Sequence, residues 1–223
     1  MTKGLFIKAF SRFAMGTILV GLLIFIPAGT IAFFNGWLLM AVLFIPMFFA
    51  GIVMMLRNPE LLEKRLNVKE KQSEQRSVIL LSGLMFLLGF VIAGLSFRFN
   101  IYIFPTIISI VATVIFLLAY MLYAEVLREN AYLSRIIEVQ ENQKVIDTGL
   151  YSVVRHPMYS ATMLLFLSIP FILGSLLTFF VFLLYPFIIV KRIQGEEKLL
   201  AKELSGYSEY QKKVKYRLIP FIW

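Results

Sequence analysis

The sequence predicts an all-α polytopic membrane protein, folded as one membrane domain over residues 1–223. Hydrophobic residues make up 60% of the chain and charged residues 16%, which lies well outside the range of soluble globular proteins. Several apolar runs reach the roughly 20 residues that a helix needs to cross a hydrocarbon core of about 30 Å. No glycine-rich phosphate loop and no GxGxxG motif is present, so we expect no Rossmann domain.

Four membrane-spanning helices are predicted in the first half of the chain, residues 1–123. The four apolar runs lie near 13–33, 36–56, 78–97 and 101–123. No small-x-small cleavage site follows the first run, so we expect an uncleaved span and not a signal peptide. A polar loop at 57–77 separates the second and third spans.

A further apolar stretch at 157–190 predicts a helical hairpin. Its 34 residues would form a helix of about 51 Å at 1.5 Å per residue, which is too long for one crossing. Gly174-Ser175 lies near the middle, so we predict two short helices over 157–173 and 176–190. The total is then about six transmembrane helices, or five if the stretch is one tilted span.

The basic residues predict the orientation of the bundle. Of the 22 Lys and Arg residues, 21 lie in the N-terminal segment, the 57–77 loop, the 124–156 segment and the C-terminal tail; Arg98 is the exception. By the positive-inside rule these regions, and both termini, are cytoplasmic. The net charge of +9 therefore indicates topology and contact with membrane lipids, and we expect no nucleic-acid partner.

The chain has no cysteine and one histidine. This composition excludes disulfides, thiolate metal sites and a cysteine nucleophile, and it disfavours a closed zinc site, which needs four ligands. We therefore expect no metal.

Polar residues gather on both sides of the predicted hairpin in residues 124–223, which we interpret as a catalytic half. The sole histidine, His156, stands between Arg155 and Pro157 at the end of a polar segment, 139–159. Beyond the hairpin, a C-terminal amphipathic helix is predicted over 191–220, with Gly206-Tyr207 and Pro220 as breaking points. Both groups would meet at the cytoplasmic membrane surface, as in an enzyme site.

The ordered motif Gly149-x-Tyr151-x3-Arg155-His156-Pro157-x-Tyr159, followed by Arg192-x3-Glu196-Glu197, resembles the isoprenylcysteine carboxyl methyltransferase family. The matching segments run from 139 to 223. The tail from Glu203 to Trp223 and the earlier stretch from Arg57 to Arg65 are similar to those of bacterial members, which implies a bacterial inner membrane. Leu150 and Ser160-Ala161 depart from residues common in the family.

The resemblance implies an integral-membrane methyltransferase that uses S-adenosylmethionine and acts on a hydrophobic or lipid-borne acceptor, with a carboxylate expected as the methylated group. It implies that Arg192 and Glu196 are catalytic residues and that Arg192 binds the substrate. The implied cofactor-binding residues are Gln140, Gln143, Lys144, Val145, Ile146, Tyr151, His156, Pro157, Met158, Tyr159 and Glu196.

Chemistry supports these assignments independently of the resemblance. A carboxylate acceptor is ionised at pH 7 and needs no general base, so the protein must mainly position two reactants. The guanidinium of Arg192 suits a carboxylate, and Glu196 lies at i+4 on the same helix face, where it could bind the amino group of the cofactor. An amine acceptor would need a base, for which Glu197, His156 or a tyrosine is available.

Structural alternatives stay open. Arg192 and Glu196 could form an ordinary i,i+4 pair, and His156 could simply cap a helix. Four aromatic residues of the tail are predicted to lie in an interfacial belt: Tyr207, Tyr210, Tyr216 and Trp223. The alternative functions are an NADPH-dependent enzyme of the sterol-reductase type and a non-catalytic membrane scaffold.

Overall fold

The computed structural model describes residues 3–66, 73–101, 103–133 and 137–223. These residues form helices and loops, with one isolated β-bridge between Ile103 and Ser175 and no named strand. The prediction of an all-α fold is confirmed. Residues 67–72 of the predicted 57–77 loop lie outside the described residues, as do residues 134–136 of the 124–156 segment.

Within the described ranges, five helical segments are long and apolar enough to cross a membrane, which confirms the polytopic membrane fold. They are α1 (Lys3–Ala28), α2 (Phe34–Arg57), α4 (Ser73–Phe99), α5 (Thr106–Glu129), and α7 (Leu176–Phe182) together with α8 (Leu184–Glu203). The remaining helices are α3 (Pro59–Leu66), the 3-10 turn η1 (Gly149–Ser152), the apolar α6 (Pro157–Leu173) and α9 (Tyr207–Lys213). The first helix begins about ten residues earlier than predicted, since no breaking residue precedes its apolar run.

The 157–190 stretch folds back on itself at Gly174. Gly174 adopts a left-handed φ of 76°, which ends α6, and the hydroxyl of Ser175 accepts a hydrogen bond from the Thr178 N–H at 3.2 Å, which caps α7. The alternative of one tilted helix is therefore wrong.

The end of the predicted hairpin and the separate 191–220 helix also need correction. Helix α8 runs without interruption past residue 190 to Glu203, because no breaking residue lies at the membrane boundary. Gly206, with φ of 83°, then separates α8 from the short α9, and residues 214–223 are not helical.

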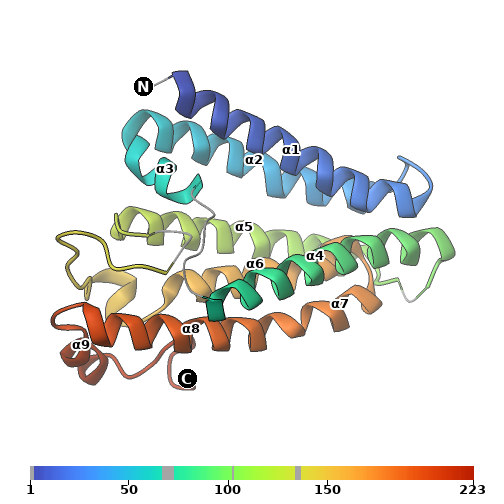
Figure 1. The fold of residues 1–223 in the computed structure, drawn as a ribbon. Coiled ribbons are helices and arrows are strands. Elements are labelled where there is room, and N and C mark those ends of the chain that lie inside the picture. The colour runs from blue at the N-terminus through green and yellow to red at the C-terminus, as the bar shows by residue number, and fades with distance from the viewer. Residues whose placement is uncertain (1–2, 67–72, 102, 134–136) are drawn as a thin grey trace.

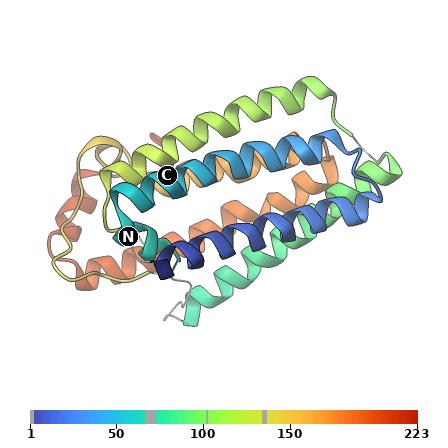
Figure 2. The ribbon, with the colours of Figure 1, turned by 90° about the horizontal axis from the view of Figure 1, so that it is seen from above.

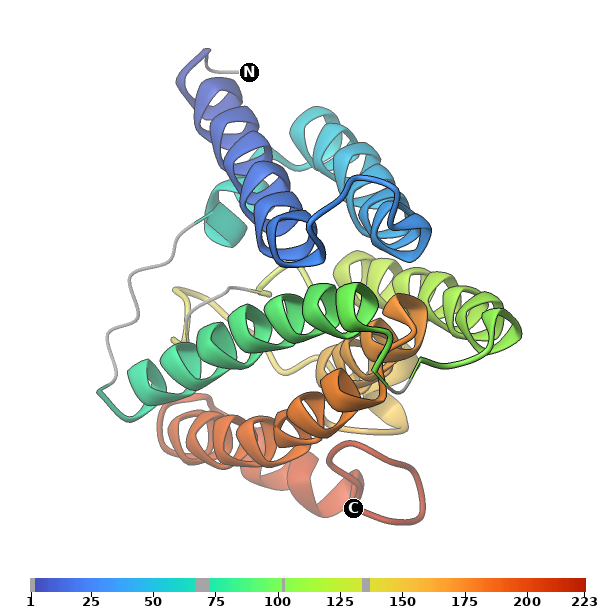
Figure 3. The ribbon, with the colours of Figure 1, turned by 90° about the vertical axis from the view of Figure 1, so that its right-hand side faces the viewer.

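The helices run side by side in a bundle (Figure 1). Helix α6 packs against α5, and α4 packs against α1, α7 and α8. The view along the bundle shows α1 and α2 as a pair beside the other helices (Figure 3). Helix α1 packs against α4, and α2 packs against α5 and α6, so the first two helices cover one side of the half that bears the motif.

The two ends of the bundle differ in content (Figures 1 and 2). At one end lie short turns between α1 and α2, α4 and α5, and α6 and α7; we call this the turn end. At the other lie α3, η1, α9 and the long segment that follows α5; we call this the loop end. The 139–159 segment and the end of α8 therefore meet at the loop end, although they are far apart in sequence.

Candidate functional site

The C-terminal tail fixes the start of α6. The backbone N–H groups of Arg155 and His156 donate to the carbonyls of Tyr216 and Arg217, both at 2.9 Å. One turn further, the Ser160 hydroxyl donates to the Leu218 carbonyl at 2.6 Å. These bonds tie the tail to the sequence motif and so set the position of the sole histidine.

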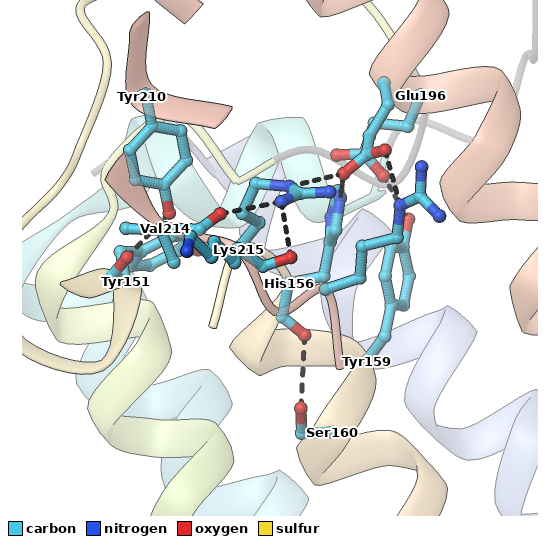
Figure 4. A network of polar contacts seen from close by, with 11 residues as sticks. Tyr151, His156, Tyr159, Ser160, Glu196, Tyr210, Val214 and Lys215 are labelled. Carbon is cyan, nitrogen blue, oxygen red and sulfur yellow. Dashed lines mark hydrogen bonds and ion pairs between the residues drawn. The ribbon is translucent and has the colours of Figure 1, made fainter. Parts of the chain in front are cut away.

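Glu197 is the centre of a buried ionic network, and one of its partners, His156, is labelled in Figure 4. Its Oε1 accepts from Arg155 Nε at 2.7 Å and lies 3.2 Å from His156 Nε2, while its Oε2 accepts from Arg217 Nε at 2.8 Å. The Glu197 side chain is only 6% exposed. Because the Glu197 carboxylate is shared among these three groups, it stabilises the fold of the loop end. It is therefore not available as a general base.

Arg155 reinforces this network. Its Nη1 donates to the carbonyls of Val214 and Lys215 at 2.7 and 3.0 Å (Figure 4). Its guanidinium is thus directed at the tail and at Glu197, and the structure gives it a structural role.

Tyr159 joins Arg192 and Glu196, the two residues that are predicted to be catalytic (Figure 4). Its hydroxyl donates to Glu196 Oε2 at 2.6 Å and accepts from Arg192 Nε at 3.0 Å. Arg192 and Glu196 lie one turn apart on α8, so the phenol of α6 holds both side chains toward the same region. This contact between helices distinguishes the arrangement from a solvated i,i+4 pair.

A polar cavity at the loop end collects most of the predicted site residues. Its walls come from the loop after α5, the start of α6, α8 and α9. The predicted residues that line it are Gln143, Lys144, Val145, Ile146, Tyr151, His156, Met158, Tyr159, Arg192 and Glu196.

Two predicted residues do not line this cavity. Gln140 donates its side-chain N–H to the Tyr132 carbonyl at 2.6 Å, and its backbone N–H donates to Gln143 Oε1 at 2.8 Å. It therefore shapes the loop. Pro157 is buried at the first position of α6, where its missing N–H costs nothing.

Tyr207 and Tyr210 correct the prediction of an interfacial belt. They are 4% and 5% exposed and line the polar cavity. Tyr210 donates its hydroxyl to the Tyr151 carbonyl at 2.7 Å, whereas the Tyr207 hydroxyl has no partner among the described residues. Their i,i+3 spacing after Gly206 was the available signal, because it places both rings on one face of a short helix.

Burial raises the pKa of the hydroxyls of Tyr151, Tyr207 and Tyr210 above the usual value near 10. All three therefore remain protonated hydrogen-bond donors at neutral and moderately alkaline pH.

Two contacts hold the C-terminal end of the loop after α5. The Glu129 carboxylate accepts from the Leu150 N–H at 3.0 and 3.2 Å, and a Cβ on Gly149, whose φ is 53°, would collide with that carboxylate. Three residues before Leu150, Lys213 Nζ lies 2.7 Å from Asp147 Oδ2, and this hydrogen bond lowers the pKa of the Asp147 carboxyl. The chain needs glycine at 149 for this close approach.

A second, largely apolar cavity of about 420 Å³ adjoins the first. Residues of α3, α4, α5, α6 and α8 line it, and it shares Met158, Tyr159 and Arg192 with the polar cavity. These three residues thus form a common wall between a polar and an apolar space. Within the described residues, no group of three His, Cys, Asp or Glu side chains could hold a metal ion.

Comparison with known proteins places this site in context. The model of the isoprenylcysteine carboxyl methyltransferase (ICMT) family matches residues 110–202, which confirms the family resemblance and supports a membrane methyltransferase. The chain is also similar to Delta(14)-sterol reductase TM7SF2 of Mus musculus, with 31% identity over 90 residues. That match covers 39% of this chain, and it spans only 22% of the length of the reductase.

Proposed function

From the match of residues 110–202 to the ICMT family, we propose that this protein transfers a methyl group from S-adenosylmethionine to a carboxylate on a hydrophobic or lipid-borne acceptor. The observation that carries the proposal is the common wall of Met158, Tyr159 and Arg192. A polar cavity on one side suits a soluble cofactor, and an apolar cavity on the other suits a lipid chain.

The polar cavity fits the cofactor through the chemistry of its walls. Glu196 offers a carboxylate to an ammonium group, and Lys144 offers a cation to a carboxylate. The Tyr207 hydroxyl is buried and has no partner among the described residues, so it is a donor that a ligand would satisfy. The rings of Tyr151 and Tyr159 line the same space, where an aromatic face suits adenine or a sulfonium cation.

S-adenosylmethionine supplies a methyl group that is already activated on sulfur. The protein then has to orient the acceptor and exclude water. Arg192 lies in the common wall and can hold a carboxylate there, while Tyr159 keeps its guanidinium in place at 3.0 Å. An ionised carboxylate needs no base. This agrees with the commitment of Glu197 to its ionic network.

We further propose that the loop end faces the cytoplasm of a bacterial inner membrane. Arg98, at the end of α4, is the one basic residue that lies at the turn end in both the described bundle and the predicted topology. The positive-inside rule therefore assigns the loop end to the cytoplasm, where S-adenosylmethionine is made.

A second candidate is a reductase that uses NADPH, favoured by the 31% identity to the sterol reductase. Against it stands the carboxylate of Glu196, which lines the polar cavity. The Glu196 carboxylate in the polar cavity would repel the phosphates of a dinucleotide.

Methyl transfer to lipids tests the proposal. Membranes that contain the protein would be incubated with S-adenosylmethionine labelled in the methyl group, and organic extracts would be treated with mild base. Release of labelled methanol, absent in Arg192→Gln, identifies a carboxyl methyl ester. Label that withstands base would indicate an amine acceptor, and no transfer by folded protein to any membrane lipid fraction would contradict the proposal.

A further inference from the structure

Three aromatic rings line the apolar cavity on the side away from the common wall. They belong to Phe86 of α4, Phe166 of α6 and Tyr185 of α8, and we call these three residues the aromatic layer. The Phe166 ring packs edge to face against the rings of Phe86 and Tyr185, with 4.8 Å between ring centres in both pairs. The Tyr185 hydroxyl donates to Thr162 Oγ1 at 2.9 Å, which holds the third ring in place. Rings from three helices thus meet across the space between these helices.

Helical spacing gives the distance from the common wall to the aromatic layer. Helix α6 begins at the loop end, and Phe166 follows Met158 of the common wall by eight positions. Helix α8 ends at the loop end, and Tyr185 precedes Arg192 of the common wall by seven positions. At 1.5 Å per residue, the aromatic layer therefore lies about 10 to 12 Å from the common wall.

Close-packed side chains lie behind the aromatic layer. Phe182 is fully buried, and its ring packs against Phe86 at 5.4 Å between ring centres. The same ring fits against the backbone of α4 at Gly89, where an added Cβ would collide with it. Ile169, three residues after Phe166 on α6, is 1% exposed. An apolar chain that enters from the common wall would therefore stop at the aromatic layer.

Phe86 belongs to a helix that the family match does not include. The match covers residues 110–202, so it assigns nothing to α4. Val78, Ser82 and Phe86 follow one another at intervals of four residues and line the cavity from one face of this helix. The extent of the cavity along α4 is thus a property of this chain that the family match leaves open.

We propose that the aromatic layer sets the chain length of the acceptor and that Phe86 is a specificity-determining residue. This inference rests on the proposed function, which places the acceptor chain in the apolar cavity. A fully extended chain advances about 1.2 Å per bond, because a residue with three backbone bonds spans about 3.5 Å. The cavity therefore takes about eight to ten carbons between the common wall and the layer. The acceptor is a carboxylate with an apolar chain of this length, and the end of a longer chain meets packed rings.

A series of alkyl carboxylates tests this length limit. Purified protein in a single detergent would be titrated with tritiated probes from octanoate to hexadecanoate, for wild type, Phe86→Ala and Phe86→Leu. Phe97→Ala is the matched control, because Phe97 lies on the same helix, stacks on Phe33 at 4.2 Å between ring centres and does not line the cavity. Each probe partitions equally into the micelles of all samples. The ratio of variant to wild-type affinity at each chain length therefore reports on the protein site.

We expect this ratio to depend on chain length in the Phe86 variants. Rings in the layer lie 4.8 Å apart, so the loss of one ring extends the cavity by about four carbons. For Phe86→Ala the ratio should be near one up to decanoate. It should then rise about fourfold per added methylene and level off near tetradecanoate. Phe86→Leu removes less volume and should show a smaller rise, whereas the ratio for Phe97→Ala should be the same at every length.

S-adenosylhomocysteine binding by the same samples shows that the variants are folded. It should change less than twofold, because Phe86 does not line the polar cavity. Phe86→Leu keeps the test decisive if the alanine variant loses this binding.

A ratio that is independent of chain length in the folded Phe86 variants would overturn the role of Phe86. The same rise in Phe97→Ala, or no binding of any carboxylate by wild type that binds S-adenosylhomocysteine, would also overturn it. Wild type that shows the length limit and its shift in the variants, but does not bind S-adenosylhomocysteine, would instead contradict the proposed function and leave the length limit standing.

Discussion

Glu196 and Glu197 are adjacent in sequence but face different surroundings. Glu196 accepts from Tyr159 at 2.6 Å and lines the polar cavity, whereas Glu197 is buried among Arg155, His156 and Arg217. A rotation of about 100° per helical residue separates the two carboxylates, so one faces the cavity and the other faces the tail. We infer that Glu196 serves ligand binding and that Glu197 supports the fold.

The two tyrosines of α9 provide a matched pair for a test at this scale. Tyr207→Phe removes a hydroxyl that has no partner within the described part of the chain. We therefore expect the melting temperature to hold or rise slightly and S-adenosylhomocysteine binding to weaken about five- to tenfold. Tyr210→Phe breaks the bond to the Tyr151 carbonyl, so it should destabilise the fold by about 1 kcal/mol with a smaller effect on binding.

Calorimetry and thermal unfolding of both variants measure these effects. Because burial raises the pKa of both hydroxyls, the difference in binding should be constant from pH 7 to pH 9. A Tyr207→Phe variant that is destabilised and binds the ligand normally would assign Tyr207 to the fold alone.

At the scale of elements, the tail from 214 to 223 is a structural part of the site. It contributes carbonyls to Arg155 and His156, and Arg217 completes the network on Glu197. Trp223 lies under the Arg217 guanidinium, 5.2 Å from ring centre to the guanidinium carbon. The start of α6 is thus held by the C-terminal tail.

Glu197→Gln tests this support. Removing the carboxylate leaves Arg155 buried without its anion, so we expect a loss of about 3 kcal/mol in the free energy of unfolding. The tail should also become accessible to hydrogen exchange and to carboxypeptidase. Glu203→Gln, an exposed change on the same helix, is the control and should behave as wild type.

A tail that stays protected in Glu197→Gln would mean that backbone hydrogen bonds alone hold it. The measurement therefore separates the ionic network from the carbonyl contacts of Tyr216 and Arg217.

Much of the architecture followed from hydrophobic pattern, since apolar length and the Gly174-Ser175 break are local properties. The prediction that the hairpin ends at 190 and that a separate helix covers 191–220 was wrong. Helix α8 continues across that boundary and ends at Glu203, shortly before Gly206. The burial of Tyr207 and Tyr210 was not predictable from composition, because it depends on how α9 folds back over the loop after α5. The role of Glu197 likewise depends on a tail that returns to α6.

Across the whole molecule, polar chemistry lies at the loop end and apolar packing at the turn end. The turn end has its own buried hydrogen bonds, such as Ser175 Oγ to Ser96 Oγ at 2.9 Å and Ser109 Oγ to the Phe171 carbonyl at 2.9 Å. These bonds fix the turn between α6 and α7 against α4 and α5. The turn end is thus a hydrogen-bonded cap of the bundle, whereas the candidate site lies at the loop end.

The absence of cysteine makes orientation simple to measure. Ser208→Cys on α9 and Thr30→Cys between α1 and α2 each place one thiol at an exposed position at opposite ends of the bundle. In intact bacterial cells, we expect a membrane-impermeant maleimide to label only Thr30→Cys, and to label Ser208→Cys after the membrane is opened. The reverse pattern would put the loop end outside the cell.

The central claim is that the polar cavity binds S-adenosylmethionine through Glu196. Its most direct test is calorimetric titration of purified wild-type protein, Glu196→Gln and Glu203→Gln with S-adenosylhomocysteine, and with NADPH in parallel. We predict that wild type and Glu203→Gln bind S-adenosylhomocysteine, that Glu196→Gln loses at least tenfold in affinity, and that NADPH does not bind. Binding of NADPH without binding of S-adenosylhomocysteine to folded wild-type protein would contradict the account and favour the reductase.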